Sequence, residues 1–373
     1  MTYKLSLYFN DFLNENIIPK NTKILYFNDI YNKKINENVL PTSLTHIKFG
    51  NFYNEEIGLN TIPNSVKYIK FGKFYNKELK ENVLPNSVEH IIFDFYYNKQ
   101  INKNVIPNSV KYLTFGYMFN QYIDNEIIPN SVKYLHLGYK FNHELNNLPN
   151  SIETLYIRSC YDIKLNENSI PKNVKKLCFK SNYNYEIKEN DIPNSVEYLK
   201  LEYKFNNTIK KFPNSLKYLF FGTYFNQYID NIPQSLIYIK FGDDFNQELN
   251  DTYSNLTHVI FGWDFNKNID VLKSIKFLSI GEKFNKSINF NVKYLFYKND
   301  ILRKYTLRHN NNVLYFINKE YYKQLQYLIY ENNGFLSDRI FKELVEYVFN
   351  PKRISYLCVI YNIEFIDYVD ILR

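Results

Sequence analysis

Apolar and polar positions recur along the chain in one short pattern. Val110, Leu113 and Phe115 are apolar, and the stretch Leu113-Thr114-Phe115 alternates as a short β-strand does. Nearly the same pattern returns every 20 to 22 residues until about residue 298. The sequence therefore predicts a solenoid of about 14 to 15 units, each of which contributes one parallel strand.

The repeated unit has a half of fixed length and a half of variable length. Eleven of the 12 prolines occupy one position of the unit, which we call the proline position. From this position to the Asn of a following aromatic-Asn pair the count is 13 residues in every unit that has both, as from Pro107 to Asn120. From that Asn to the next proline position the count varies between four and nine. We expect the fixed half to hold the structure and the other half to tolerate deletions.

The aromatic-Asn pair predicts a structural ladder. Stacked amides can donate to and accept from turn backbone that would otherwise be buried unpaired, while the aromatic side chains fill the core. The predicted Asn ladder comprises Asn32, Asn54, Asn76, Asn98, Asn120, Asn142, Asn184, Asn206, Asn226, Asn246, Asn266 and Asn285, with Asp162 as the exception. Gly follows the strand in eight units, where we expect a tight turn or close approach of backbone.

These repeated residues resemble a known family. The string F-N-x-x-I-x-x-x-x-I-P-N-S-V-K-Y-L-x-F-G resembles the FNIP repeat, a relative of the leucine-rich repeat found in social amoebae and large DNA viruses. The resemblance implies a curved solenoid with one parallel strand in each unit. Some members join the repeats to an F-box, but here the repeats begin almost at Met1, and we expect no N-terminal F-box.

The C-terminal part of the chain departs from the repeat. From about Asn299 the pattern indicates helices over 301–309 and 313–330, and a third one after Ser337, which is a suitable N-cap. The sequence thus predicts a solenoid over residues 1–298 and an α-helical module over 299–373. Such a module would cap the last exposed core face or bind a second partner.

Leucine-rich geometry assigns a candidate binding surface. If the apolar strand residues point inward, their neighbours form two outward columns on the concave face. The candidate partner-binding residues are Tyr112, Thr114, Tyr134, His136, Tyr156, Tyr198, Lys200, Tyr218, Phe220, Tyr238 and Lys240. The first column is mostly aromatic, and stacking within it could stabilise the sheet, dock a protein, or do both. Specificity should lie in the second column, which contains Thr114 and varies between units.

Composition and charge narrow the classes of partner. The chain has 373 residues and a formal charge of +8, from 46 basic and 38 acidic residues without a block of five like charges. This mixture makes nucleic acid an unlikely partner. Three cysteines provide no disulfide framework, and neither a signal peptide nor an apolar run long enough for a membrane span is present. We expect an intracellular, cytoplasmic protein without membrane contact, in the host cytoplasm if it is viral.

The candidate chemistry is sparse. His46, His90 and His258 share one column, but the closest two are two units apart, about 10 Å, which is too far for common metal ligation. No phosphate-binding glycine loop is present. We therefore expect no enzyme activity, metal or cofactor, and predict a non-enzymatic scaffold for a protein or peptide partner. The alternative is a substrate-recognition subunit for ubiquitin transfer, with the helical tail contacting the ligase.

Overall fold

A computed structural model describes residues 1–158, 164–180, 182–288, 292, 294–299, 304–309 and 314–318. The chain forms two compact units, Met1–Gly222 and Thr223–Arg373. The described residues of both units form short strands joined by irregular turns, with one short 3-10 helix in the second unit.

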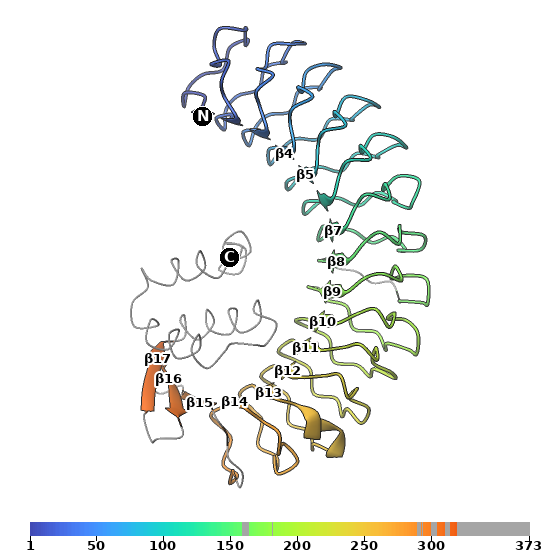
Figure 1. Ribbon diagram of the computed structural model, residues 1–373, viewed down its shortest axis with the longest axis vertical. Helices are drawn as coiled ribbons and strands as arrows, with labels where there is room; N and C mark the ends of the chain where they lie inside the picture. Colours follow the sequence, from blue (N-terminus) through green and yellow to red (C-terminus); the bar gives the residue numbers. More distant parts are fainter. Residues whose placement is uncertain are drawn as a thin grey trace. The chain divides into compact units, whose positions relative to one another are not determined.

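The first unit is a parallel β-solenoid. Its strands are β1 (Thr2–Lys4), β2 (Ile24–Tyr26), β3 (His46–Lys48), β4 (Tyr68–Lys70), β5 (His90–Ile92), β6 (Tyr112–Thr114), β7 (Tyr134–Leu137), β8 (Thr154–Ile157), β9 (Lys176–Phe179), β10 (Tyr198–Leu201) and β11 (Tyr218–Phe221). Each strand pairs in parallel with the next one, so that equivalent residues are opposite each other, as Leu113 is to Leu135. Within this unit the strands line the concave side of the stacked coils (Figure 1).

The turn that enters each strand is fixed by the Pro-Asn-Ser segment. In the coil of β6, the backbone N–H of Val110 donates to the carbonyl of Pro107 at 3.1 Å. The Ser109 hydroxyl donates to the carbonyl of Val88 in the preceding coil at 2.6 Å. Ser therefore satisfies a backbone acceptor of its neighbour, which explains why this segment recurs.

Two kinds of small or polar residue permit the other turns. A Cβ atom on Gly116 would lie 1.9 Å from the carbonyl oxygen of Asp94, so the strand exit requires glycine. In the variable half of the coil, Asn38, Asn60 and Asn82 adopt positive φ values of 58°, 53° and 62°. Asn tolerates this left-handed conformation better than other side chains, which accounts for part of the asparagine content.

The core consists of stacked columns of identical positions. Leu113 and Phe119 are fully buried, and Phe115 is nearly so. The ring centroids of Phe71, Phe93 and Phe115, just after the strands, are separated by 5.0 and 5.6 Å.

Curvature follows from the spacing of these columns. Strands in a sheet lie about 4.8 Å apart. In the column that precedes the Asn ladder, farther from the sheet, Tyr75, Tyr97 and Phe119 are separated by 6.0 and 6.2 Å. Because the coils are closer at the strands than at the aromatic-Asn pairs, they fan out with the sheet on the inner side.

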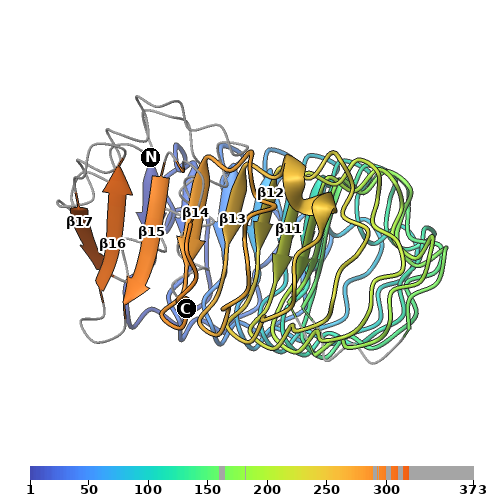
Figure 2. The same cartoon turned by 90° about the horizontal axis from the view of Figure 1, so that it is seen from below.

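The described part of the second unit is also built mainly of short strands. It contains β12 (Tyr238–Lys240), the 3-10 helix η1 (Asp251–Asn255), β13 (His258–Ile260), β14 (Phe277–Ile280), β15 (Tyr294–Asn299), β16 (Lys304–His309) and β17 (Leu314–Asn318). Strands β12 to β15 pair in parallel, and β15, β16 and β17 pair antiparallel, side by side in Figure 2. In η1, buried Tyr253 occupies the proline position.

The expected helices over 301–309 and 313–330 are wrong where the structure describes them. Residues 304–309 and 314–318 are strands. The physical reason is local: Tyr305 and Leu307 alternate with polar residues, and 314–317 is aromatic and apolar, both of which favour strands. The helix expected after Ser337 lies outside the described residues, and the boundary at 298 stays a prediction.

Candidate functional site on the strand face

The strand face of the first unit consists of the outward side chains of β1 to β11. In β6 the central Leu113 is fully buried, whereas Tyr112 beside it is 45% exposed and Thr114 is partly exposed. This arrangement follows from the period of two in a strand, which sends successive side chains to opposite faces. The two columns that contain Tyr112 and Thr114 therefore lie on the concave side.

Rings stack along the first column. His46 and Tyr68 have centroids 5.5 Å apart, and Tyr68 and His90 are separated by 5.9 Å. The His90 and Tyr112 rings are 4.2 Å apart and almost parallel, with an interplanar angle of 4°. Contacts between the same positions of neighbouring strands stabilise a sheet. The same row presents partly exposed aromatic rings to solvent, so stabilisation and partner binding are compatible.

The predicted binding residues divide into an accessible and a buried group. Tyr112 is exposed, and Thr114, Tyr134, His136, Tyr156, Lys200 and Lys240 are partly exposed. Tyr198, Tyr218, Phe220 and Tyr238 are buried, with exposed fractions of 8%, 8%, 7% and 1%.

The buried group corrects the expectation of a uniformly open ladder. Around Tyr198, the ring of Phe220 lies 4.9 Å away, and the Lys176 ammonium lies 5.1 Å from the Tyr198 centroid. Side chains packed in this way present little surface to a partner. The accessible part of the predicted surface in the first unit therefore lies over β6, β7 and β8, with Lys200 on β10.

Two titratable groups of the second column have shifted pKa values. His136 is partly exposed as a whole, but its Nε2 atom is buried and has no hydrogen-bond partner among the described residues. Burial, together with the positive charges of Arg158 and Lys180, lowers the pKa of His136 to about 3. Burial raises the pKa of the Cys178 thiol to about 11, which leaves it protonated and a poor nucleophile at neutral pH.

Sequence reasoning missed three cations beside this column. Arg158 and Lys180 occupy the position where eight other units have glycine, and Lys176 belongs to the first column. The Nζ atoms of Lys176 and Lys180 lie 5.6 and 5.8 Å from the centroid of the Tyr156 ring. The replacement of glycine in consecutive units was the signal in the sequence that could have identified two of them.

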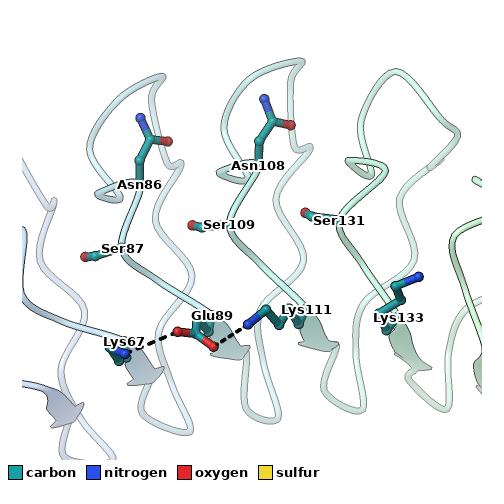
Figure 3. A pocket seen from close by; sticks show the side chains of 9 residues that line it. All are labelled: Lys67, Asn86, Ser87, Glu89, Asn108, Ser109, Lys111, Ser131 and Lys133. Atoms are coloured by element: carbon teal, nitrogen blue, oxygen red, sulfur yellow. Dashed lines mark hydrogen bonds and ion pairs between the residues drawn. The ribbon is translucent and has the colours of Figure 1, made fainter.

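A polar depression lies at the edge of the sheet, just before the strands (Figure 3). Glu89 accepts from Lys111 at 2.8 Å and pairs with Lys67 at 3.4 Å. These hydrogen bonds and charges lower the pKa of the Glu89 carboxyl. The hydroxyls of Ser109 and Ser131 donate to carbonyls of preceding coils. These side chains thus already have hydrogen-bond or ion-pair partners, and the depression forms no evident catalytic arrangement.

The asparagines predicted as a structural ladder form a hydrogen-bonded column. The backbone N–H of most of them donates to the side-chain oxygen of the equivalent asparagine in the preceding coil, as Asn120 does to Asn98 at 2.8 Å. Within the two units these distances run from 2.7 to 3.0 Å. The Asn side chains therefore replace a missing backbone acceptor on the side of the coil away from the sheet.

The part of the chain that the structure describes contains no group of three His, Cys, Asp or Glu side chains placed to hold a metal ion. None of the helical turns described has the length and apolar composition of a bilayer span.

Parallel strands in a common register, stacked aromatic columns and an Asn ladder define a leucine-rich-repeat-like solenoid, a scaffold fold commonly used for protein–protein interaction. The FNIP Repeat model matches residues 9–52, 53–96, 75–118, 119–160, 161–204 and 225–252. The chain therefore belongs to the FNIP repeat family.

A solved structure shows the same fold. The chain is similar to CroV588, described as a novel circular leucine-rich-repeat protein, with 36% identity and a TM-score of 0.60. This match covers 78% of the present chain and 51% of CroV588, so the chain spans about half the length of that protein. A weaker similarity, with 14% identity and a TM-score of 0.30, links it to YopM from Yersinia enterocolitica WA-314, covering 72% of this chain and 82% of YopM. A search of curated proteins found no match.

Proposed function

We propose that the protein is a non-enzymatic scaffold that binds a protein or peptide partner on the strand face of the first unit. The observation that carries this proposal is the continuous row of outward rings on β3 to β7, next to a column that holds lysine, isoleucine, threonine and histidine in these coils. Aromatic side chains are enriched at protein interfaces because they bury a large area at a low cost in conformational entropy.

The length of the strand face from β3 to β8 suits an extended segment. From β3 to β8 there are five steps between strands, or about 24 Å at the usual spacing of about 4.8 Å. An extended peptide covers that length with about seven residues. Tyr112, Tyr134 and Tyr156 would contact it through their rings, and Thr114 and His136 would provide the contacts that differ between coils.

Affinity capture from cell extract with matched variants of the full-length chain tests this proposal. Tyr112→Ala with Tyr134→Ala alters the strand face, and Tyr8→Ala with Tyr122→Ala removes two tyrosines outside the strands, of which 83% and 45% are exposed. We expect the strand-face variant alone to lose partners, with circular dichroism confirming that both variants fold. The proposal fails if the two variants and the unaltered chain capture the same proteins in equal amounts.

The ubiquitin-transfer alternative depends on the tail. The segments 304–309 and 314–318 are strands, and the rest of the expected helical region lies outside the described residues. This alternative stays a prediction. The same capture experiment addresses it, because ubiquitin-ligase subunits lost from a chain that ends at residue 298 would favour it.

A further inference from the structure

Three consecutive coils have another residue in place of the glycine that follows the strand. At Gly138 an added Cβ atom would lie 1.7 Å from the carbonyl oxygen of Gly116, which shows how little room this turn leaves. The next three coils carry Arg158, Lys180 and Glu202 at the equivalent position. A departure from a locally favoured residue in successive repeats indicates a role beyond stacking.

The backbone accommodates these residues by extending the sheet. The N–H of Arg158 donates to the carbonyl of Leu137 at 3.2 Å, and the N–H of Lys180 donates to that of Ile157 at 2.9 Å. Since Ile157 points into the core and strand side chains alternate, Arg158 projects on the same face as Tyr156. By the same alternation Lys180 projects on this face in the next coil.

Cations gather here around one aromatic ring. Lys176 and Lys180 both lie within 6 Å of the Tyr156 centroid, a distance at which a ring attracts a cation. We call Arg158, Lys176, Lys180 and Tyr156 the cationic patch. In the described part of the chain, Arg158 and Lys180 form no ion pair, and the nearby carboxylate of Glu202 pairs with Lys200.

Several positive charges act on Lys180. Burial lowers the pKa of Lys180, the charges of Lys200 and Arg158 lower it as well, and the carboxylate of Glu202 opposes them. His136, in the adjacent coil, is held neutral by burial and by Arg158 and Lys180. A negatively charged group at this place would relieve the repulsion between the cations.

The following inference rests on the proposed function and concerns the chemistry of the partner. We infer that the partner presents an acidic peptide segment whose carboxylates bind Arg158, Lys176 and Lys180 over the ring of Tyr156. The patch spans only β8 and β9, and toward the N-terminus the charge of Lys70 is already paired with Asp94 at 3.3 Å. A short acidic segment fits such a local patch better than a nucleic acid, which requires a longer run of cations along its backbone.

Fluorescence anisotropy with the full-length chain tests this inference. The probes are labelled octaglutamate, labelled octaglutamine and labelled oligo-dT of eight nucleotides. We expect octaglutamate to bind at least tenfold more tightly than octaglutamine at low salt, and to weaken at least tenfold between 50 and 500 mM NaCl, because salt screens exposed charges. Oligo-dT should bind more weakly than octaglutamate.

Matched variants assign the binding to the patch. Arg158→Gln with Lys180→Gln should weaken octaglutamate binding at least tenfold, and Arg158→Lys with Lys180→Arg should restore it. Lys80→Gln with Lys99→Gln removes the same charge from two exposed lysines outside the strands and should change the affinity less than twofold.

The outcomes separate this inference from the proposed function. If octaglutamate binds no better than octaglutamine, or if oligo-dT binds more tightly, the acidic-peptide inference is wrong even when capture depends on Tyr112 and Tyr134. The inference is also wrong if both pairs of Gln substitutions weaken octaglutamate binding equally, because the peptide would then respond to the total charge of the protein and not to the cationic patch. The comparison of probes on the unaltered chain decides the case even if a variant fails to fold.

Discussion

Replacing Tyr97 by Phe should stabilise the protein, although it removes a polar atom from a tyrosine in the middle of the core. The side chain of Tyr97 is fully buried, and its hydroxyl has no hydrogen-bond partner within the described residues. Tyr31, Tyr53 and Tyr75 share both properties. The following coil has Phe119 at the same position, with its ring 6.2 Å from that of Tyr97 and nearly parallel.

The magnitude follows from two opposing terms. A buried hydroxyl that has lost its water and gained no partner destabilises the folded state by about 1 to 3 kcal/mol. Removing the oxygen leaves a void of roughly 15 Å³, which costs about 0.4 kcal/mol at about 24 cal/mol per Å³. We therefore expect Tyr97→Phe to raise the free energy of unfolding by about 1 to 2 kcal/mol.

Urea unfolding followed by circular dichroism measures this change, and the neighbouring coil provides the matched control. Phe119→Tyr introduces a hydroxyl in the same column and should lower the free energy of unfolding by a similar amount, because Phe119 is fully buried. If Tyr97→Phe destabilises the protein, the hydroxyl is hydrogen bonded in solution, and our account of this column is wrong.

Three further predictions concern the turns and the strand face. Asn98→Ala should lower the free energy of unfolding by about 1 to 3 kcal/mol in urea titrations, because the N–H of Asn120 loses its acceptor. Asn98→Asp keeps an acceptor and should lower this free energy less. Gly116→Ala should destabilise the folded protein by about 2 kcal/mol or more and lower its thermal midpoint, since the added Cβ would meet the Asp94 carbonyl. An unchanged thermal midpoint would refute the close approach. His136 has a folded-state pKa below its ordinary value, so its contribution to stability is present above about pH 6.5 and is lost as the pH falls toward 3. Between pH 7 and 5 this amounts to about 2 kcal/mol, and His136→Gln should remove that part of the pH dependence in urea titrations at the two pH values.

The repeated architecture could be predicted from the sequence because the spacing of residues is constant in the half of the unit where neighbouring coils must match. The interval of 13 residues from Pro107 to Asn120 spans the entering turn, the strand and the exit turn. In a stacked solenoid these elements must match their neighbours, and Leu113 does lie opposite Leu135. The variable half of the unit does not have to match in this way. The register of the strands could therefore be predicted without knowing the length of that half.

Burial on the strand face could not be predicted from the repeat alone. Tyr112 and Tyr198 are the same residue type at the same position of the unit, yet one is 45% exposed and the other 8%. The difference depends on neighbours such as Phe220, which packs on Tyr198 from the next coil. A pattern within one coil contains no information about such contacts between columns.

The C-terminal strands were missed for a different reason. The segment 304–309 alternates only over a few residues, and short apolar stretches fit a strand and a helix equally well until their neighbours are known. Pairing with β15 supplies those neighbours, because an antiparallel strand gains a complete ladder of backbone hydrogen bonds there.

Site-specific photocrosslinking tests the central claim, that a partner binds on the strand face, most directly. A photoreactive phenylalanine analogue would replace Thr114 on the strand face or Tyr122 in the variable half of the same coil, and adducts would be resolved by electrophoresis after irradiation in cell extract. The account predicts discrete adducts of higher mass from position 114 and none from position 122. Adducts from position 122 without any from position 114 would contradict it.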